Sequence, residues 1–193
     1  LNSSCASEDF IFESKSIELL NSTKTIMANE GVIITSSDGI NISALMSNYD
    51  KISKILSLEK NAIIKDELNG LSLKSEKIIY DKNKEIIFSK GKTEIFFRDL
   101  YVLKGKDINF DRNLLKLSSE SKATLKDNSN NILNLKSFNY SIKDKQLETN
   151  QLTYLDNNGN KFVSENSIID LNNQKIASKD VERMTLAEYK AFG

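Results

Sequence analysis

Residues 69–84, NGLSLKSEKIIYDKNK, contain a turn, a strand and a second turn in succession. Asn69-Gly70 is a favoured hairpin turn, because both residue types adopt positive φ at low cost. From Leu71 to Ser75, apolar or small residues alternate with polar ones, which is typical of a strand with one buried face. Tyr80-Asp81-Lys82 then leads into a turn rich in Asn and Lys. The stretch therefore predicts a β-strand held between two tight turns.

This pattern recurs about every thirty residues. The anchor of each unit is a large apolar or aromatic residue: Leu19, Tyr49, Tyr80, Phe110, Tyr140 and Ile169. Successive anchors are 30, 31, 30, 30 and 29 residues apart, so six units cover nearly the whole chain. A fixed period of this length is typical of an array built from one supersecondary unit.

Three columns of large apolar residues accompany the anchors. Seven positions before them stand Phe12, Ile42, Leu73, Leu103, Leu133 and Phe162. Seven positions after them stand Ile26, Leu56, Ile87, Leu117, Leu147 and Ile176. Fifteen positions after them stand Ile34, Ile64, Ile95, Leu125, Leu155 and Met184. Small residues follow the first column by two places, at Ser14, Ala44, Ser75, Gly105 and Ser164. We expect all three columns to point inward.

Each repeat unit is predicted to contain a strand, a turn, a second strand, a bend and a third strand, in this order. Residues suited to a bulge or bend stand at Gly31, Asn61, Gly91, Ser121 and Asn150. The chain is therefore expected to be all-β, an antiparallel stack of six β-meander repeats. Only Thr185 to Phe192 has helical composition, and this stretch is too short to be stable alone. The inward columns fit either a packed core or a lipid-filled slot between two sheets.

An array that does not close leaves an edge strand at each end. The chain has no Pro to blunt such an edge, and nothing at residues 10–14 has the pattern of a cap. Edge-to-edge pairing with another β-protein is therefore expected.

Composition excludes several classes of function. Lys+Arg and Asp+Glu are both 27, so the net charge is zero, which argues against nucleic acid as a partner. The absence of His excludes catalytic triads with a His base and leaves a zinc site few ligands. One Cys cannot form an internal disulfide. No apolar run reaches the roughly 20 residues of a transmembrane helix. We expect no enzyme activity, no metal and no cofactor.

Several other groups of residues could be taken for functional sites. The acids near the turns are about thirty residues apart, which favours turn formation over a calcium ladder: Asp50, Asp81, Asp111, Asp144 and Asp170. Glycosidases use two carboxylates held at a fixed distance from each other. Nothing in the sequence fixes that distance for Glu13 with Glu18 or for Glu165 with Asp170. Cys5 as a nucleophile lacks a His base. Three lysines are expected near the groove mouth, facing lipid phosphates or only solvent: Lys60, Lys92 and Lys122.

The repeat frame resembles the OstA-like family of lipopolysaccharide-transport proteins. The resemblance rests on Gly39 before Tyr49-Asp50-Lys51, on residues 61–64, on Gly70 before Tyr80-Asp81-Lys82, and on Gly91-Lys92. Residues 28–34 also resemble the opening strand of that family. The likeness runs from about residue 10 to residue 181. It fits either the N-terminal periplasmic domain of the outer-membrane lipopolysaccharide-assembly protein or the periplasmic bridge protein.

The resemblance implies a β-jellyroll shaped like a folded taco, with lipid A acyl chains in its apolar groove. The implied groove residues are Phe12, Ile42, Leu73, Leu103, Leu133, Phe162, Ile26, Leu56, Ile87, Leu117, Leu147, Ile34, Ile64, Ile95 and Leu125. It implies a periplasmic location, with tethering at the outer membrane as an option. The implied partners are lipopolysaccharide and other OstA-like jellyrolls joined through edge strands, including head-to-tail copies of this chain. A dry-cored structural module for protein assembly is the alternative.

The domain boundaries follow from the repeats. Residues 7–184 are expected to form a single jellyroll domain, and residues 185–193 a short tail. Residues 1–6 are expected to be a signal-peptide remnant or a disordered tail, because Ser4-Cys5-Ala6 reads as a small-x-small cleavage site. Lipidation of Cys5 is the competing interpretation.

Overall fold

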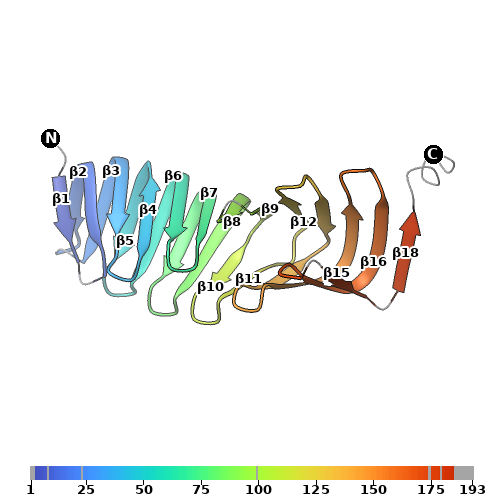
Figure 1. Cartoon of the computed structure of the whole chain (residues 1–193). Helices are drawn as coiled ribbons and strands as arrows, with labels where there is room; N and C mark the ends of the chain where they lie inside the picture. The colour runs from blue at the N-terminus through green and yellow to red at the C-terminus, as the bar shows by residue number, and fades with distance from the viewer. Residues whose placement is uncertain are drawn as a thin grey trace.

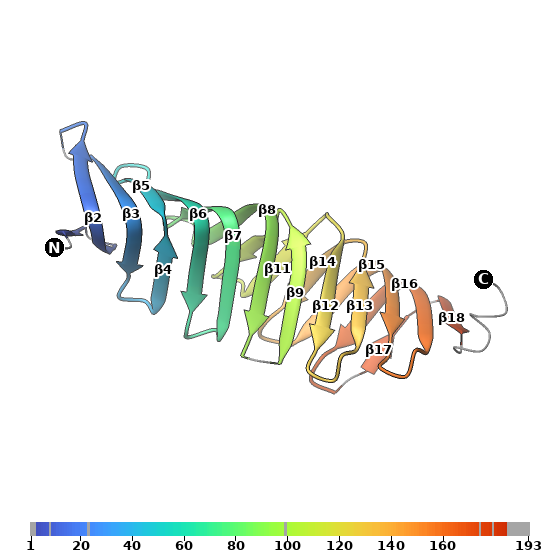
Figure 2. The ribbon, with the colours of Figure 1, turned by 90° about the horizontal axis from the view of Figure 1, so that it is seen from above.

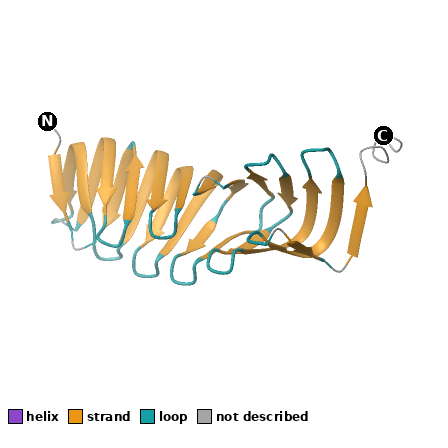
Figure 3. Ribbon diagram, viewed as in Figure 1, coloured by secondary structure: helices purple, strands orange, loops and turns teal. Residues whose placement is uncertain are grey.

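The structure is a computed structural model that describes residues 3–7, 9–22, 24–98, 100–173, 175–178 and the backbone of 180–184. Eighteen β-strands form one continuous hydrogen-bonded system, and all of their pairings are antiparallel. Figure 3 shows strands and loops but no helix in this part of the chain. The described residues thus hold no helix long and apolar enough to cross a membrane. The all-β prediction is confirmed.

The strands stack in chain order into a long, narrow array (Figure 1, Figure 2). Hydrogen bonding divides the array into two sheets, which we call the first wing and the second wing. Seven long strands cross both wings: β2 (Ile11–Leu20), β3 (Thr25–Thr35), β6 (Ile55–Asp66), β7 (Leu71–Asp81), β8 (Ile86–Phe97), β15 (Gln146–Leu155) and β16 (Lys161–Asp170).

The remaining strands belong to one wing each. The first wing also contains β1 (Ser3–Ala6), β4 (Ile40–Ala44), β9 (Tyr101–Lys106), β12 (Ala123–Asp127), β13 (Ile132–Leu135) and β18 (Asp180–Met184). The second wing also contains β5 (Met46–Asp50), β10 (Asn109–Asp111), β11 (Lys116–Ser119), β14 (Phe138–Ser141) and β17 (Lys175–Ala177). Together the wings form the predicted jellyroll, folded along its length.

The fold line between the wings, here called the crease, lies where the long strands change register. The shifts fall between Ser14 and Ser16, between Glu59 and Ala62, and between Ser75 and Lys77. Gly31, Asn61 and Gly91 have φ of 90°, 54° and 83° at the crease, a region that favours Gly and Asn. The bulges predicted at these positions are confirmed, and they turn each long strand from one wing into the other.

The small residues predicted beside the first column lie along the inside of the crease. Hydroxyl groups there donate to carbonyl groups near the register shifts: Ser75 Oγ donates to Lys90 O and Lys92 O at 3.3 and 3.0 Å. Ser119 Oγ donates to Lys106 O at 2.6 Å. A Cβ at Gly105 would lie 3.3 Å from Ala123 Cβ. The crease is therefore tightly packed around Ser75, Gly105 and Ser119.

The hairpin turns of the two wings face each other on the side opposite the crease, and we call this line the mouth. Between crease and mouth runs one apolar core. The aromatic anchors belong to it: Tyr49, Tyr80 and Phe110 are at most 1% exposed, and Tyr140 is 7% exposed. Phe10 makes edge-on contacts with Tyr49 and Tyr80 at ring-centroid distances of 5.2 and 5.9 Å. The core thus ties the two wings together.

The N-terminal end differs from the expectation. Ser3–Ala6, expected to lie in a tail, forms β1 and pairs with residues 11–14 of β2. The expectation of an uncapped edge at residues 10–14 is thereby corrected, because extended small residues satisfy the free backbone groups of β2. Residues 16–20 of β2 have no further strand beside them among the described residues. Residues 185–193, the expected short tail with helical composition, lie outside the described residues.

Candidate lipid-binding trough

The interior of the folded array contains nearly all of the fifteen predicted groove residues. Fourteen of them are buried, with Leu133 the most exposed at 6%. Phe162 is partly buried and packs against the same core. The structure thus brings the three columns together on the inside of both wings. We name the halves of the trough by their second-wing turns: residues 51–54, 82–85 and 112–115 belong to the N-terminal half, and residues 142–145 and 171–173 to the C-terminal half. In the N-terminal half the interior side chains belong to one buried cluster.

The third column changes register near the C-terminus. In β6 the buried positions step from Leu58 in the second wing to Ala62 in the first wing, four residues later. In β15 they step from Thr149 to Leu152, only three residues later. The crease of β15 is one residue shorter, so the side chains beyond it exchange faces. Leu155, expected inside, is therefore 36% exposed, while Tyr154 packs against the core. Ile176 is partly buried, and the side chain of Met184 lies outside the described residues.

The mouth of the N-terminal half is bridged by an ionic cluster, here called the clasp, which consists of Asp38, Asp66, Lys82, Glu85 and Arg112. Arg112 stands on a second-wing turn, and its side chain is 9% exposed. Its Nε donates to Asp66 Oδ2 at 3.0 Å, and its Nη1 donates to Asp38 Oδ2 at 2.9 Å. Both carboxylates belong to the first wing, so Arg112 joins the two wings directly across the mouth.

The clasp is completed by Lys82, Glu85 and the Tyr80 hydroxyl. Lys82 Nζ lies 2.5 Å from both Asp38 Oδ2 and Glu85 Oε1. Tyr80 Oη donates to Glu85 Oε2 at 2.7 Å and accepts from Arg112 Nη1 at 2.8 Å. Arg112 also pairs with Glu85. Every charged group of the clasp therefore has an opposite charge beside it.

The clasp shifts the titration of its members. Burial alone would raise the pKa of Asp38, but hydrogen bonds from Lys82, Ser36 and Arg112 hold it well below its usual range. Burial opposes the charge of Arg112, but Asp38 and Asp66 raise the pKa of its guanidinium. Burial, followed by the hydrogen bond with Glu85, raises the pKa of Tyr80. Asp38 and Arg112 are consequently charged at neutral pH, and the Tyr80 phenol is neutral.

A second link across the mouth lies nearer the N-terminus. Asp9, just before β2, accepts from Tyr49 Oη at 2.5 Å and from Lys54 Nζ at 3.3 Å. Lys54 lies on a second-wing turn, whereas Asp9 precedes the first wing. This link and the clasp bridge the mouth of the N-terminal half. A hollow of about 280 Å³ lies beside the link, lined by first-wing residues only: Ser7, Asp9, Phe10, Ile11, Thr35, Ser36 and Ser37.

In the C-terminal half the mouth opens into a cavity of about 550 Å³. Its apolar and aromatic lining comes from both wings: Leu68, Phe97, Leu100, Tyr101, Tyr140, Ile142 and Leu171. Phe97 and Tyr140 meet edge-on across the mouth at 5.3 Å between ring centroids. Tyr101 Oη donates to Leu171 O at 3.1 Å. Burial raises the pKa of Tyr140 to about 12, so its phenol stays neutral.

A smaller cavity of about 190 Å³ adjoins the larger one and shares Tyr101 and Leu171 with it. Leu133, one of the fifteen predicted groove residues, lines this smaller cavity with Tyr154 and Ile169. The accessible apolar space that both wings line therefore lies in the C-terminal half of the trough, where their interior side chains meet the mouth.

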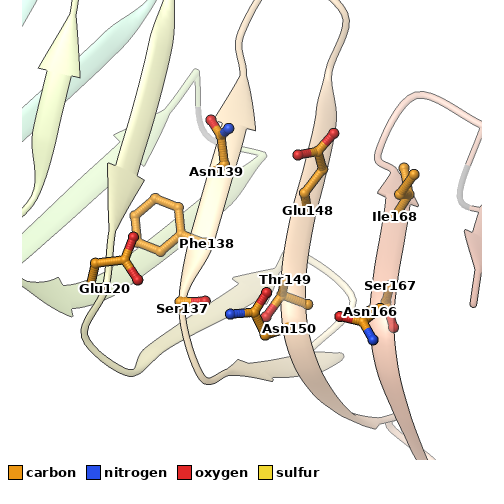
Figure 4. A pocket seen from close by; sticks show the side chains of 10 residues that line it. All are labelled: Glu120, Ser137, Phe138, Asn139, Glu148, Thr149, Asn150, Asn166, Ser167 and Ile168. Carbon is orange, nitrogen blue, oxygen red and sulfur yellow. The ribbon is translucent and has the colours of Figure 1, made fainter.

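A further hollow of about 320 Å³ lies at the crease of the C-terminal half (Figure 4). Its outward-facing lining is mainly polar and includes Glu120, Asn139, Glu148, Asn150 and Asn166. This hollow is on the side opposite the mouth, and its carboxylates and amides do not suit an acyl chain.

The acids predicted at the turns, the two carboxylate pairs and Cys5 lie apart from the cavities at the mouth, except for Asp170, which lines the smaller one. The carboxylates of Asp50, Asp81, Asp111 and Asp170 accept from backbone N–H groups of their own turns, as expected of turn formers. No three metal-ligating side chains gather among the described residues. Glu13 and Glu18 lie on opposite sides of the crease, as do Glu165 and Asp170. Cys5 is free and packs against the core from β1.

The lysines expected at the mouth are elsewhere. Lys60, Lys92 and Lys122 lie at the crease, where the chain passes from one wing to the other. The expectation was wrong because the bends of the repeat form the crease, whereas its turns form the mouth. Cations at the open part of the mouth are instead Arg98 and Lys145.

No protein-family model matches the sequence, and no curated protein matches it. Among solved structures the chain is similar to LptH from Pseudomonas aeruginosa, the LptA homologous periplasmic component of the lipopolysaccharide transport device. The identity is 12%, the TM-score is 0.31, and the match covers 77% of this chain and 97% of that one. The TCP10 domain of Danio rerio CPAP, in complex with a STIL peptide, matches at 8% identity and a TM-score of 0.23, covering 96% and 99%. At these TM-scores neither likeness indicates what this chain binds.

Proposed function

We propose that this protein is a non-enzymatic carrier or bridge for lipopolysaccharide, with acyl chains sheltered in the C-terminal half of its trough. The observation that carries the proposal is the cavity of about 550 Å³ at the mouth, lined by apolar side chains of both wings. Its volume is within the roughly 300–1,000 Å³ range of ligand pockets. Each acyl CH₂ group buried there would contribute about 0.8 kcal/mol.

The choice of lipid rests on the repeat motifs that resemble the OstA-like family. The same resemblance supports a periplasmic location, optionally with tethering at the outer membrane. Backbone groups along residues 16–20 of β2 and along β17 and β18 support edge-strand pairing with other jellyrolls or with further copies of this chain. All chemistry in this proposal is binding, so no catalytic residue, metal or cofactor takes part.

A structural module for protein assembly is the second candidate. It is favoured by the N-terminal half, where interior side chains such as Ile26, Leu56 and Ile87 are 0% exposed and the mouth is bridged. A dry core of this kind needs no ligand. The two candidates make opposite predictions for the C-terminal cavity.

Replacing Leu100 or Ile142 by Asp tests the carrier function. Both side chains line the cavity, and Leu100 is already 52% exposed, so the fold should survive. We expect a loss of lipid affinity of at least about tenfold, because a carboxylate would be desolvated by an acyl chain. Native mass spectrometry of the full chain with added lipopolysaccharide measures the bound fraction.

The matched control is Leu114→Asp, since Leu114 is 63% exposed on a turn away from the cavity. It should bind lipid like the unmodified chain. Absence of lipid from the unmodified chain, or equal binding by all variants, would favour the assembly module.

A further inference from the structure

Two cations stand at the rim of the open cavity, one from each wing. Arg98 follows β8 in the first wing, and Lys145 stands on the turn before β15 in the second wing. Both side chains line the cavity of about 550 Å³ and are otherwise exposed to solvent. They therefore frame the point at which an apolar ligand would leave the trough for water.

The rim cations differ from those of the clasp in their partners. Lys82 and Arg112 are each paired with at least two carboxylates. Within the described residues, neither Arg98 nor Lys145 forms an ion pair with an acid, and the polar contact of Lys145 is with Asn172 Oδ1 at 3.4 Å. Neither rim cation thus has a carboxylate partner in the part of the chain that the structure describes, and the nearest acids among the cavity linings are Asp127 and Asp170 of the adjoining smaller cavity.

The position of Arg98 depends on Gly70. A Cβ at Gly70 would lie 1.8 Å from Arg98 Nε and 2.6 Å from its Cγ, so only glycine lets this side chain lie across the turn. Gly70 also has a φ of 65°, which penalises any other residue. Its carbonyl accepts from Arg98 N at 3.1 Å. The turn thereby holds the guanidinium group beside the cavity.

We propose that Arg98 and Lys145 bind the anionic phosphate head group of an amphiphile whose acyl chains occupy the cavity. The inference rests on the proposed function and adds the chemistry of the head group. A guanidinium offers paired N–H donors that match phosphate oxygens, and an ammonium adds a point charge. The apolar lining from Phe97, Ile142 and Leu171 receives the chain below them. An amphiphile with a neutral head group would gain only the apolar part of this binding energy.

The test compares dodecyl phosphate with dodecyl maltoside, which carry the same alkyl chain, below their micelle-forming concentrations. Isothermal titration calorimetry with the full chain should show tighter binding of the phosphate by about tenfold. Arg98→Gln and Lys145→Gln should each weaken phosphate binding by about threefold. The double variant should bind both amphiphiles alike, with maltoside affinity unchanged throughout.

Lys143→Gln is the matched control, because Lys143 is an exposed lysine of the same turn that does not line the cavity. It should leave both affinities unchanged. Equal binding of the two amphiphiles by the unmodified chain would overturn the head-group inference and leave the carrier function standing. Binding of neither would overturn both. Inorganic phosphate binding as tightly as dodecyl phosphate would replace the amphiphile with a free-anion site.

Discussion

The two halves of the trough share one repeat but differ in the chemistry of the mouth. Two positions after the anchor, the N-terminal half has Lys82 and Arg112, which bridge the wings through carboxylates. The same position in the next two units holds Ile142 and Leu171, which line the open cavity. A backbone repeat therefore supports either a sealed or an open mouth, and a single side-chain position per unit marks the difference.

The packing behind the mouth follows the same division. Interior residues of the N-terminal half, such as Ile26, Ile64 and Ile87, are 0% exposed and belong to the apolar core. In the C-terminal half Tyr154, Phe162 and Ile176 are only partly buried. The sealed half thus has the properties of a stabilising core, while the open half retains accessible apolar surface for a ligand.

The largest expected effect is that of a charge placed inside the sealed half. Leu73→Asp should lower the free energy of unfolding by more than about 4 kcal/mol, because Leu73 is 1% exposed and the carboxylate would have no partner. Leu100→Asp, at the open cavity, should cost less than about 1 kcal/mol. Urea denaturation of both variants measures the difference. Similar losses at the two sites would refute the division into a sealed and an open half.

The second-largest expected loss of stability follows from replacing Arg112, the centre of the clasp. Arg112→Met leaves Asp66, whose side chain is 0% exposed, without its cation, and should cost about 3–5 kcal/mol. Adding Asp66→Asn should recover part of this loss, since the uncompensated buried charge is then gone. Hydrogen exchange should also become faster at the turns around Asp38 and Lys82. These changes are measured by urea denaturation and by exchange followed with mass spectrometry.

Lys84→Met is the control for the clasp. Lys84 forms an ion pair with Asp81 at 3.2 Å, but its side chain is 72% exposed. An exposed pair of this kind contributes about 0–1 kcal/mol. A loss for Arg112→Met no larger than that of Lys84→Met would show that the clasp does not hold the wings together.

The fold was predictable because its signals are local and repeated. Alternation such as that of Leu71 to Ser75 identifies a strand, and Asn69-Gly70 identifies a turn, without knowledge of the rest of the chain. Fourteen of the fifteen predicted interior residues are buried for the same reason. The remaining one, Phe162, is partly buried. Leu155, a third-column residue outside those fifteen, is exposed because one residue is missing at a crease, which a fixed count cannot detect.

The mouth was not predictable from the repeat. Asp38 and Arg112 are 74 residues apart in sequence, and the thirty-residue period does not specify which first-wing turn faces which second-wing turn. One signal was available, since Arg98 and Arg112 are two of only three arginines among 27 basic residues. Arg rather than Lys is suited to multidentate contacts with anions, and Arg112 makes such contacts with Asp38, Asp66 and Glu85.

The smallest expected effect is a local loss of stability in acid at the turn that carries Asp38. Hydrogen bonds within their own turns also lower the pKa of Asp156 and Asp170 in the C-terminal half, so the comparison is made at residues 140–145, away from those turns. The pKa of Asp38 is held below its usual value, so its contribution is fully present above about pH 4 and is lost as the pH falls further. Asp38 is 35% exposed, so after solvent screening the loss should not exceed about 1 kcal/mol. Hydrogen exchange at pH 5 and pH 3, corrected for the intrinsic rate, should show loosening around residues 36–40 but not around residues 140–145. Asp38→Asn should remove this difference, because residue 38 then no longer titrates. An equal response of both halves would assign the acid sensitivity to the whole molecule and not to the clasp.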